Sequence, residues 1–467
     1  VTSVAAAVAV VAATLLWPRV ALADADAVLN QRDLDKKGIA VVKLRRGMTV
    51  QTMLQIAQKE KENSIVELAL GNFLEGGGAK GEEAAAAVAA CAMRRGMFEV
   101  TAATAAVNNQ MSDIVSLFTG DSRANTPKTR TLAAMILACY GRALNAPEPR
   151  FPSEQMHGEG PPDDKKKKKK RGNAVSKMPK ADPDRIAKAL KVLLDDRDET
   201  TVELAILAAA LLEVKDVQEQ IDELNLNGSA EGEAARLLYR SPIGVALDAD
   251  EVATVFARRT RPSRFFIKLS PLMSMYDPRS PVLGYACEAI GEAGDAKLLE
   301  HVHKTLLHEK DLRAQIDAAR AIEMVGSHDS VETLIKALPE SPWPLKVAIC
   351  SAMGAIPDKR SIEPLIDQLA EEEGRFRLDI NYALASITDG QKGTDSEGWR
   401  AWWGTAQSEF KVDEKKTAAF RASHRVQDMN VAPLGSFYDT SIFSDRVAFV
   451  LDTSASMRGD KFKSLQE

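Results

Sequence analysis

The chain has 467 residues, a length that leaves room for two to four domains. Its hydrophobic share of 45% and charged share of 27% are those of ordinary globular protein. The formal net charge of −5 gives no overall positive field, which disfavours nucleic acid as a partner. Aromatic residues make up only 5% while Ala is common, and this composition favours closely packed helices.

The N-terminal segment, residues 1–23, has the pattern of a secretory signal peptide. Val4 to Trp17 is an almost unbroken apolar run, and Ala21 and Ala23 stand where a signal peptidase reads small residues. A basic start is missing and the first residue is Val, which indicates a start further upstream or a non-standard start read literally. We expect export to the periplasm, the cell envelope or the medium, with membrane association only if the signal stays uncleaved. An apolar anchor or a buried helix is the alternative.

Residues 24–145 are predicted to be a helical region, with helices near 50–74, 82–95, 101–118 and 129–145. Without a clean period, this region fits either divergent repeats or a compact bundle. Residues 146–183 are rich in Pro and contain the run Lys165 to Lys170, which breaks helices and repels itself. We expect a disordered linker there. Binding of an anionic surface by the lysine run is the less favoured alternative.

A repeat organises residues 184–410. Small anchor residues recur about every 31 residues, and each is followed by a second apolar residue; the anchors are Ala289, Ala321, Ala352 and Ala383. Apolar residues three positions away lie on the same helical face. A turn containing Asp and a second apolar helix follow each anchor. Because one helix pair cannot bury its own apolar stripe, the pattern predicts stacked helix pairs.

These repeats resemble HEAT repeats, in particular the short bacterial type with a small-residue helix followed by Asp. The resemblance covers about residues 280–390, with a weaker unit at 185–225. It implies an α-solenoid with a concave face for protein partners. Trp399, Trp402 and Trp403 follow the last repeat at helical spacing. They predict a cap over the open end of the solenoid, and an aromatic platform for a ligand is the alternative.

Three histidines are the other candidate for a site. His301, His303 and His308 stand close in sequence, but no Cys or carboxylate completes a convincing set of metal ligands. His303 also occupies a semi-buried repeat position. No Ser-His-Asp, Cys-His or paired-carboxylate arrangement can be placed in one pocket from the sequence. We therefore expect no metal site at these histidines and no enzymatic activity.

The last part of the chain changes character. Residues 411–443 are predicted to be a connector. Val447 to Leu451 is a continuous apolar run, typical of a strand buried on both faces. Asp452, Ser454 and Ser456 follow at once and gather hard oxygen ligands at the carboxyl end of that strand.

This stretch, residues 444–467, resembles the first metal-ion-dependent adhesion motif of a von Willebrand factor A domain, with Ala455 where the family usually has Gly. The resemblance implies an α/β domain in which Asp452, Ser454 and Ser456 bind Mg²⁺. In the family a Thr and a second Asp from later loops complete the site, and those loops would lie beyond Glu467. We therefore expect a truncated domain start, and magnesium binding in the intact parent but not in these 467 residues.

The sequence thus predicts a mainly α protein: a HEAT-like α-solenoid followed by the first strand of a von Willebrand factor A-type domain. The expected function is that of a non-enzymatic scaffold. It would bind protein partners through the concave solenoid face and through the adhesion domain, and it would not bind nucleic acid. An enzyme accessory or lyase-like HEAT-repeat protein is the alternative, because short HEAT-like repeats also occur in such proteins.

Overall fold

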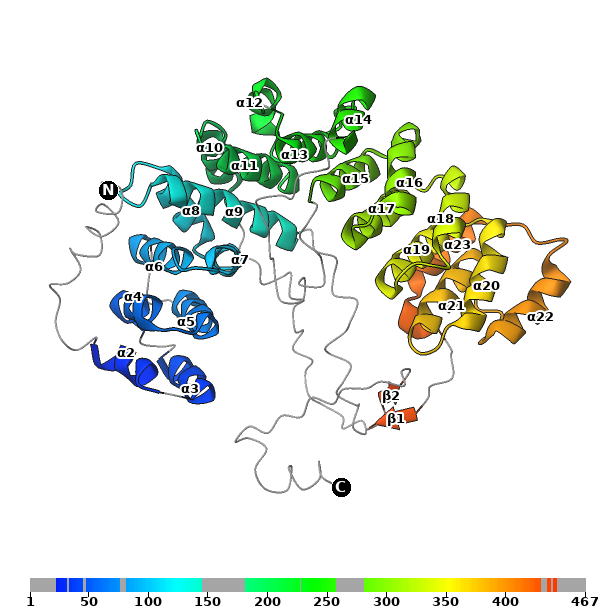
Figure 1. The fold of residues 1–467 in the computed structure, drawn as a ribbon, viewed down its shortest axis with the longest axis horizontal. Helices are drawn as coiled ribbons and strands as arrows, with labels where there is room; N and C mark the ends of the chain where they lie inside the picture. The colour runs from blue at the N-terminus through cyan, green and yellow to red at the C-terminus, as the bar shows by residue number, and fades with distance from the viewer. Residues whose placement is uncertain are drawn as a thin grey trace, which may run out of the picture. The chain divides into compact units, whose positions relative to one another are not determined.

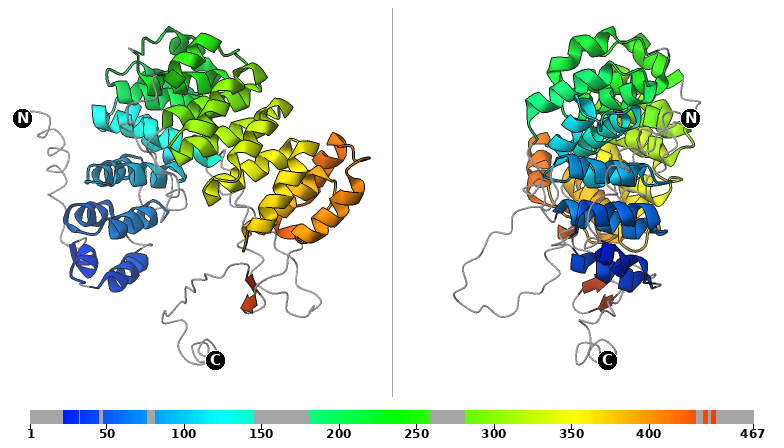
Figure 2. Two further views of the ribbon diagram at one scale, coloured as in Figure 1. Left: turned by 45° about the vertical axis from the view of Figure 1, so that its right-hand side comes forward. Right: turned by 90° about the vertical axis from the view of Figure 1, so that its left-hand side faces the viewer.

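The computed structural model describes residues 22–31, 33–44, 48–75, 81–144, 181–226, 228–257, 281–429, 435–437 and 440–442 (Figure 1). This part is mainly helical, and the chain divides into two compact units, Val1–Ala293 and Gly294–Glu467. Within each unit, helices pack side by side in stacked pairs (Figure 2). The arrangement is consistent with the predicted α-solenoid. Among the described helices, none is both long enough and apolar enough to span a membrane.

The described part of the first unit is a succession of helices. They are α2 (Leu22–Leu29), α3 (Leu34–Leu44), α4 (Val50–Lys59), α5 (Asn63–Glu75), α6 (Glu82–Ala92), α7 (Phe98–Ala106), α8 (Met111–Thr119), α9 (Pro127–Leu144), α10 (Pro183–Leu194), α11 (Glu199–Leu211), the 3₁₀ turn η3 (Lys215–Val217), α12 (Gln218–Glu223), α13 (Ala230–Arg240), α14 (Ala249–Ala257) and α15 (Pro281–Ala293). Helices α9, α11, α13 and α15 pack in succession. Gly141 allows α9 and α11 to approach closely, since a Cβ there would lie 2.6 Å from that of Leu211.

Two of the helices predicted in this unit are each divided into two shorter helices in the structure. The range 50–74 breaks at Glu60, whose carboxylate accepts the next two backbone N–H groups at 2.8 and 3.0 Å and pairs with Lys37 at 2.7 Å. The range 101–118 breaks at Asn108, whose side chain accepts the backbone N–H two residues on at 3.0 Å. Such local side-chain bonds compete with the helical ladder, and the expected helices were wrong for this reason.

The second unit continues the helix pairs. Its described elements are η5 (Ala296–Leu298), α16 (Leu299–His308), α17 (Leu312–Val325), η6 (His328–Ser330), α18 (Val331–Ala337), α19 (Trp343–Ala355), η7 (Lys359–Ser361), α20 (Ile362–Glu371), α21 (Phe376–Ile387), α22 (Ser396–Ala406), α23 (Glu414–Ser423), η8 (Val426–Asp428), β1 (Gly435–Phe437) and β2 (Thr440–Ile442). Helices α17, α19 and α21 form one layer, and each packs on one helix of the other layer, α16, α18 or α20. The strands pair antiparallel, with Gly435 opposite Ile442.

The repeat anchors lie in the cores of their helices. Ala289 and Ala352 are fully buried, and Ala321 and Ala383 are 1% exposed. The predicted apolar positions of the second helices are buried as well; they are Val302, Leu306, Leu334, Leu338, Leu365 and Leu369. Asp358 begins the turn η7 by accepting the backbone N–H of Arg360 at 2.8 Å. The repeat spacing therefore predicted the buried face of these helices correctly. Small residues at the anchor positions let neighbouring helices approach closely, and larger side chains would overpack the contact.

Several sequence predictions fall largely outside the described residues. The signal peptide 1–23 does so up to residue 21, and the linker 146–183 does so between residues 145 and 180. The predicted strand at 447–451 and the whole range 444–467 also lie outside them. The connector 411–443 contains more structure than expected: helix α23, the turn η8 and the hairpin of β1 and β2.

Candidate functional site

The predicted magnesium ligands Asp452, Ser454 and Ser456 lie outside the described residues. Of the three histidines, His303 has a structural role, since its Nε2 lies 2.8 Å from the buried hydroxyl of Ser330. Burial lowers the pKa of this imidazole. The part of the chain that the structure describes holds no group of three or more His, Cys, Asp or Glu side chains that could bind a metal ion.

The best-formed candidate site is the surface on which helix α23 lies, and it belongs to the layer of α17, α19 and α21 (Figure 1). Helix α23 begins at Asp413, whose carboxylate accepts the backbone N–H groups of Lys415 and Lys416, both at 3.1 Å. Glu414 in the first turn and Arg421 in the last turn complement the helix dipole. These local signals favour a ten-residue helix, which packs on α21 within the second unit.

An apolar seat holds the C-terminal half of α23. Phe420 is 9% exposed and packs with Leu378 and Ala385 of α21 and with Met429 after η8. The Tyr382 ring adds an edge to this seat, with its centroid 6.1 Å from that of Phe420. The Tyr382 hydroxyl also donates to a backbone carbonyl just after α23, at 3.1 Å. One aromatic side chain therefore anchors the helix to α21.

A polar contact extends from α23 to the other two helices of the layer. Arg421 Nη2 donates to Glu323 Oε1 of α17 at 3.0 Å, and its Nη1 donates to the backbone carbonyl of Ser351 in α19 at 3.4 Å. The Ser351 hydroxyl donates to the same Glu323 oxygen at 3.0 Å. Gly354 leaves room for the guanidinium, since a Cβ there would lie 3.4 Å from Arg421 Nη1.

We call this surface the helix-binding face and define it by Glu323, Ser351, Gly354, Leu378 and Tyr382. It combines an acceptor for one guanidinium with an apolar seat for one aromatic ring. The two features meet side chains that are adjacent in the sequence of α23. The face therefore contacts α23 mainly through two adjacent side chains, Phe420 and Arg421.

Charges at the edge of the face add weaker contacts. Lys416 Nζ lies 3.3 Å from Asp389, and Glu414 lies 3.6 Å from His328 Nε2. The other ring nitrogen of His328 lies 3.2 Å from Asp358. Hydrogen bonds lower the pKa of Asp358 to about 2, and the Arg360 side chain makes the largest contribution. Lys416 and Glu414 are mostly exposed, so their pairs with the face contribute little to stability.

The hold on α23 is modest. Only Thr417 and Phe420 are buried within the helix, and the Thr417 hydroxyl has no hydrogen-bond partner in the described part of the chain. Burial of a Phe side chain contributes about 1.5–3 kcal/mol, an unsatisfied buried hydroxyl costs about 1–3 kcal/mol, and the ion pairs add roughly 1 kcal/mol. These terms largely cancel and leave a balance of roughly 1 kcal/mol, so α23 is held weakly on the face.

The tryptophans after the last repeat are part of the core rather than an open platform. Trp399 is fully buried and donates from Nε1 to Asn381 of α21 at 2.7 Å. Trp403 is 7% exposed, and Lys359 Nζ lies 5.6 Å from its ring centre. Trp402 is half-buried and packs edge to face against Phe410, with ring centroids 5.7 Å apart. This packing agrees with the predicted cap.

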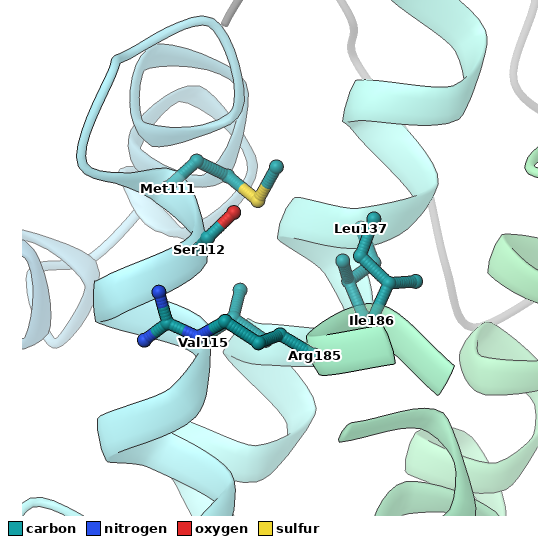
Figure 3. Close-up of a pocket in the computed structure, with 6 residues that line it drawn as sticks. All are labelled: Met111, Ser112, Val115, Leu137, Arg185 and Ile186. Atoms are coloured by element: carbon teal, nitrogen blue, oxygen red, sulfur yellow. The ribbon is translucent and has the colours of Figure 1, made fainter. Parts of the chain in front are cut away.

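A small depression lies between α8, α9 and α10 of the first unit (Figure 3). Met111, Ser112, Val115, Leu137, Arg185 and Ile186 line it. Its empty volume of about 160 Å³ includes open solvent and is smaller than an ordinary small-molecule site. Arg185 pairs across the surface with Asp113 at 2.9 Å. The depression therefore offers no enclosed ligand site.

The helix-binding face was not predicted from the sequence, because residues 411–443 were interpreted as a connector. A signal was present: Asp413 is a good helix start, and Thr417, Phe420 and Arg421 share one helical face. The target of that face could not be read from the sequence, since Glu323 lies about 100 residues earlier.

No protein-family model matches this chain, and no curated protein matches it.

Proposed function

We propose that this chain is a non-enzymatic scaffold whose stacked helix pairs bind helical segments of protein partners. The observation that supports the proposal is the seat of α23 on the helix-binding face, where one helix contacts α17, α19 and α21 at once. A surface that holds a short helix through one aromatic ring and one guanidinium has the features of helix-in-groove recognition.

We further propose that the helix pairs are HEAT-like repeats. The supporting observation is the burial of Ala321, Ala352 and Ala383 at equivalent places in α17, α19 and α21. Solenoids of such pairs present long continuous layers, and each repeat adds one helix to the layer. A partner that contacts several consecutive helices suits this geometry.

The adhesion part of the proposal rests on sequence resemblance. We propose that Asp452, Ser454 and Ser456 bind Mg²⁺ in a chain that carries the complete von Willebrand factor A-type domain, where the ion would bridge to a carboxylate of a partner. Export through residues 1–23 would place both binding surfaces outside the cytoplasm. Calorimetry with magnesium on the complete protein and on its Asp452→Ala variant tests this part, and equal heats from the two would refute it.

Site-specific photo-crosslinking in cells tests the scaffold function. A photoreactive amino acid replaces Met324, which is 47% exposed in α17 beside Glu323. The matched control carries the same amino acid at Lys336, which is exposed on α18 in the other layer. We expect a discrete protein crosslink from the first position that Glu323→Arg abolishes, and none from the second. Absence of any protein crosslink from both positions would refute the scaffold function.

A further inference from the structure

We infer that α23 occupies the site of a partner helix, so that it must leave the helix-binding face before the partner binds. This inference rests on the proposed scaffold function and adds to it both the chemistry of the partner and a means of control. The occupant of the face would be a basic helix with a small residue, an aromatic residue and an Arg at positions i, i+3 and i+4. These are the positions of Thr417, Phe420 and Arg421 on α23.

Helix α23 contacts the helix-binding face through few side chains. Of the ten residues of α23, only Thr417 and Phe420 are buried, and Arg421 keeps 25% of its side chain exposed. The remaining side chains add little to the seat, apart from the exposed edge pairs. A helix from another protein that carries the same three side chains could therefore make the same contacts.

A helix-binding face without α23 would lack a cation and an aromatic ring. Without α23, Glu323 would keep the Ser351 hydroxyl as a neutral donor at 3.0 Å but would lose its guanidinium. Leu378 and Tyr382 would lose the aromatic ring that covers them. Asp389, which pairs with Lys416 and Lys392, would lose one of these two cations. The empty face is acidic and apolar, and this combination selects a basic aromatic helix and rejects an acidic one.

Thr417 of α23 is poorly accommodated where it is buried. Its buried hydroxyl has no hydrogen-bond partner among the described residues, so α23 fills the face imperfectly. A partner with Ala or Val at this position would avoid the unsatisfied hydroxyl and would bind in preference to α23. Helix α23 then competes with the partner helix for the face. Because α23 is tethered, its effective concentration at the face is high, and this sets the affinity that a partner helix needs in order to displace it.

A labelled peptide tests the inference on the full 467-residue chain. The peptide spans residues 412–426, and fluorescence anisotropy reports its binding. Arg421→Glu in the chain places two carboxylates together and unseats α23, so we expect it to bind the peptide roughly five- to tenfold more tightly than the unchanged chain. Lys415→Glu makes the same charge change at an exposed position of α23 and should bind like the unchanged chain.

A charge swap identifies the face itself. Glu323→Arg added to Arg421→Glu restores a pair of opposite charge, so α23 should seat again and peptide binding should fall back. Phe420→Ala in the chain is a second way to unseat α23 and should also raise the affinity. The same substitution in the peptide should lower its affinity at least tenfold. Circular dichroism confirms that each variant keeps its helices.

Two results would overturn the inference. One is equal peptide affinity for the unchanged chain, Arg421→Glu and Phe420→Ala, because α23 would then not compete for the face. The other is a dimer of the unchanged chain by light scattering that the peptide converts to a monomer, because a second copy would then be the occupant. Neither result would remove a partner crosslink at Met324, so the crosslinking experiment tests the scaffold function independently of this inference.

Discussion

The unsatisfied hydroxyl in α23 gives a sharp prediction. Thr417 and Thr305 are each 2% exposed and each lies in a helix of the second unit. The Thr305 hydroxyl donates to the backbone carbonyl of His301 at 2.9 Å, whereas the Thr417 hydroxyl has no partner among the described residues. Val has nearly the same shape as Thr, so Thr→Val at the two positions separates the cost of the hydroxyl from the effect of packing.

We expect Thr417→Val to stabilise the seated state of α23 by about 1–2 kcal/mol, because it removes a buried group that water would otherwise solvate. Thr305→Val should be neutral or cost up to about 1 kcal/mol, because it removes a hydrogen bond. Hydrogen exchange measures the first effect directly, since 1.4 kcal/mol slows exchange through local opening about tenfold. The α23 amides should therefore exchange roughly 5–30 times more slowly in Thr417→Val.

Thr417→Val should also weaken binding of the 412–426 peptide, because the seated fraction rises. Far-ultraviolet circular dichroism and urea titration establish that both Val variants are folded. Unchanged or faster exchange of the α23 amides in Thr417→Val would refute the reasoning. So would a stabilisation by Thr305→Val of equal size.

Three further predictions concern packing and pH. Gly141→Ala should lower the free energy of unfolding by about 1–3 kcal/mol, because its Cβ would lie 2.6 Å from that of Leu211. Gly71→Ala in α5, with no atom within 4 Å of the new Cβ, should raise it by about 0.5–1 kcal/mol in the same urea titration. Ser330→Ala should cost about 1 kcal/mol, because it removes the hydrogen-bond partner of the half-buried His303 imidazole. At Ser361, whose buried hydroxyl is unsatisfied in the described structure, the same change should be neutral or stabilising. The pKa of Asp358 is lowered to about 2, so its contribution is present above about pH 4 and is lost as the pH falls toward 2; thermal melts of Asp358→Asn should lack this acid-dependent step.

The repeat spacing predicted the buried layer well because burial in a helix pair follows a local period. Ala321 and Ala352 could be assigned to helix contacts from their intervals alone, and both are buried. The breaks at Glu60 and Asn108 could not be assigned in this way. At each break, a side-chain oxygen accepts hydrogen bonds from backbone N–H groups that would otherwise bond within a helix. The hydrophobic periodicity of the sequence does not show which of these two bonding patterns forms.

The candidate site was harder to predict than the fold for a different reason. The N-cap and the apolar position of α23 are readable from residues 413–420, so the helix itself could have been predicted. Its seat depends on Glu323 and Ser351, which lie in two different helix pairs. Many exposed Glu residues occupy helices of this chain, and the sequence does not distinguish the one that meets Arg421 from the rest. Only the stacking of the repeats brings these residues together.

The polar half of the face explains why an apolar partner would not suffice. Glu323 keeps 22% of its side chain exposed when it is paired, so the pair with Arg421 is partly desolvated. A partner that covers the face without bringing a cation would bury this carboxylate further and leave it with the Ser351 hydroxyl alone, at a cost of several kcal/mol. A partner that brings Lys would satisfy the charge, but it would lose the forked contact that Arg421 makes to Glu323 and to the Ser351 carbonyl. If the face binds a partner helix as we propose, the geometry of one guanidinium would set its specificity, and the aromatic ring beside it would supply most of the affinity.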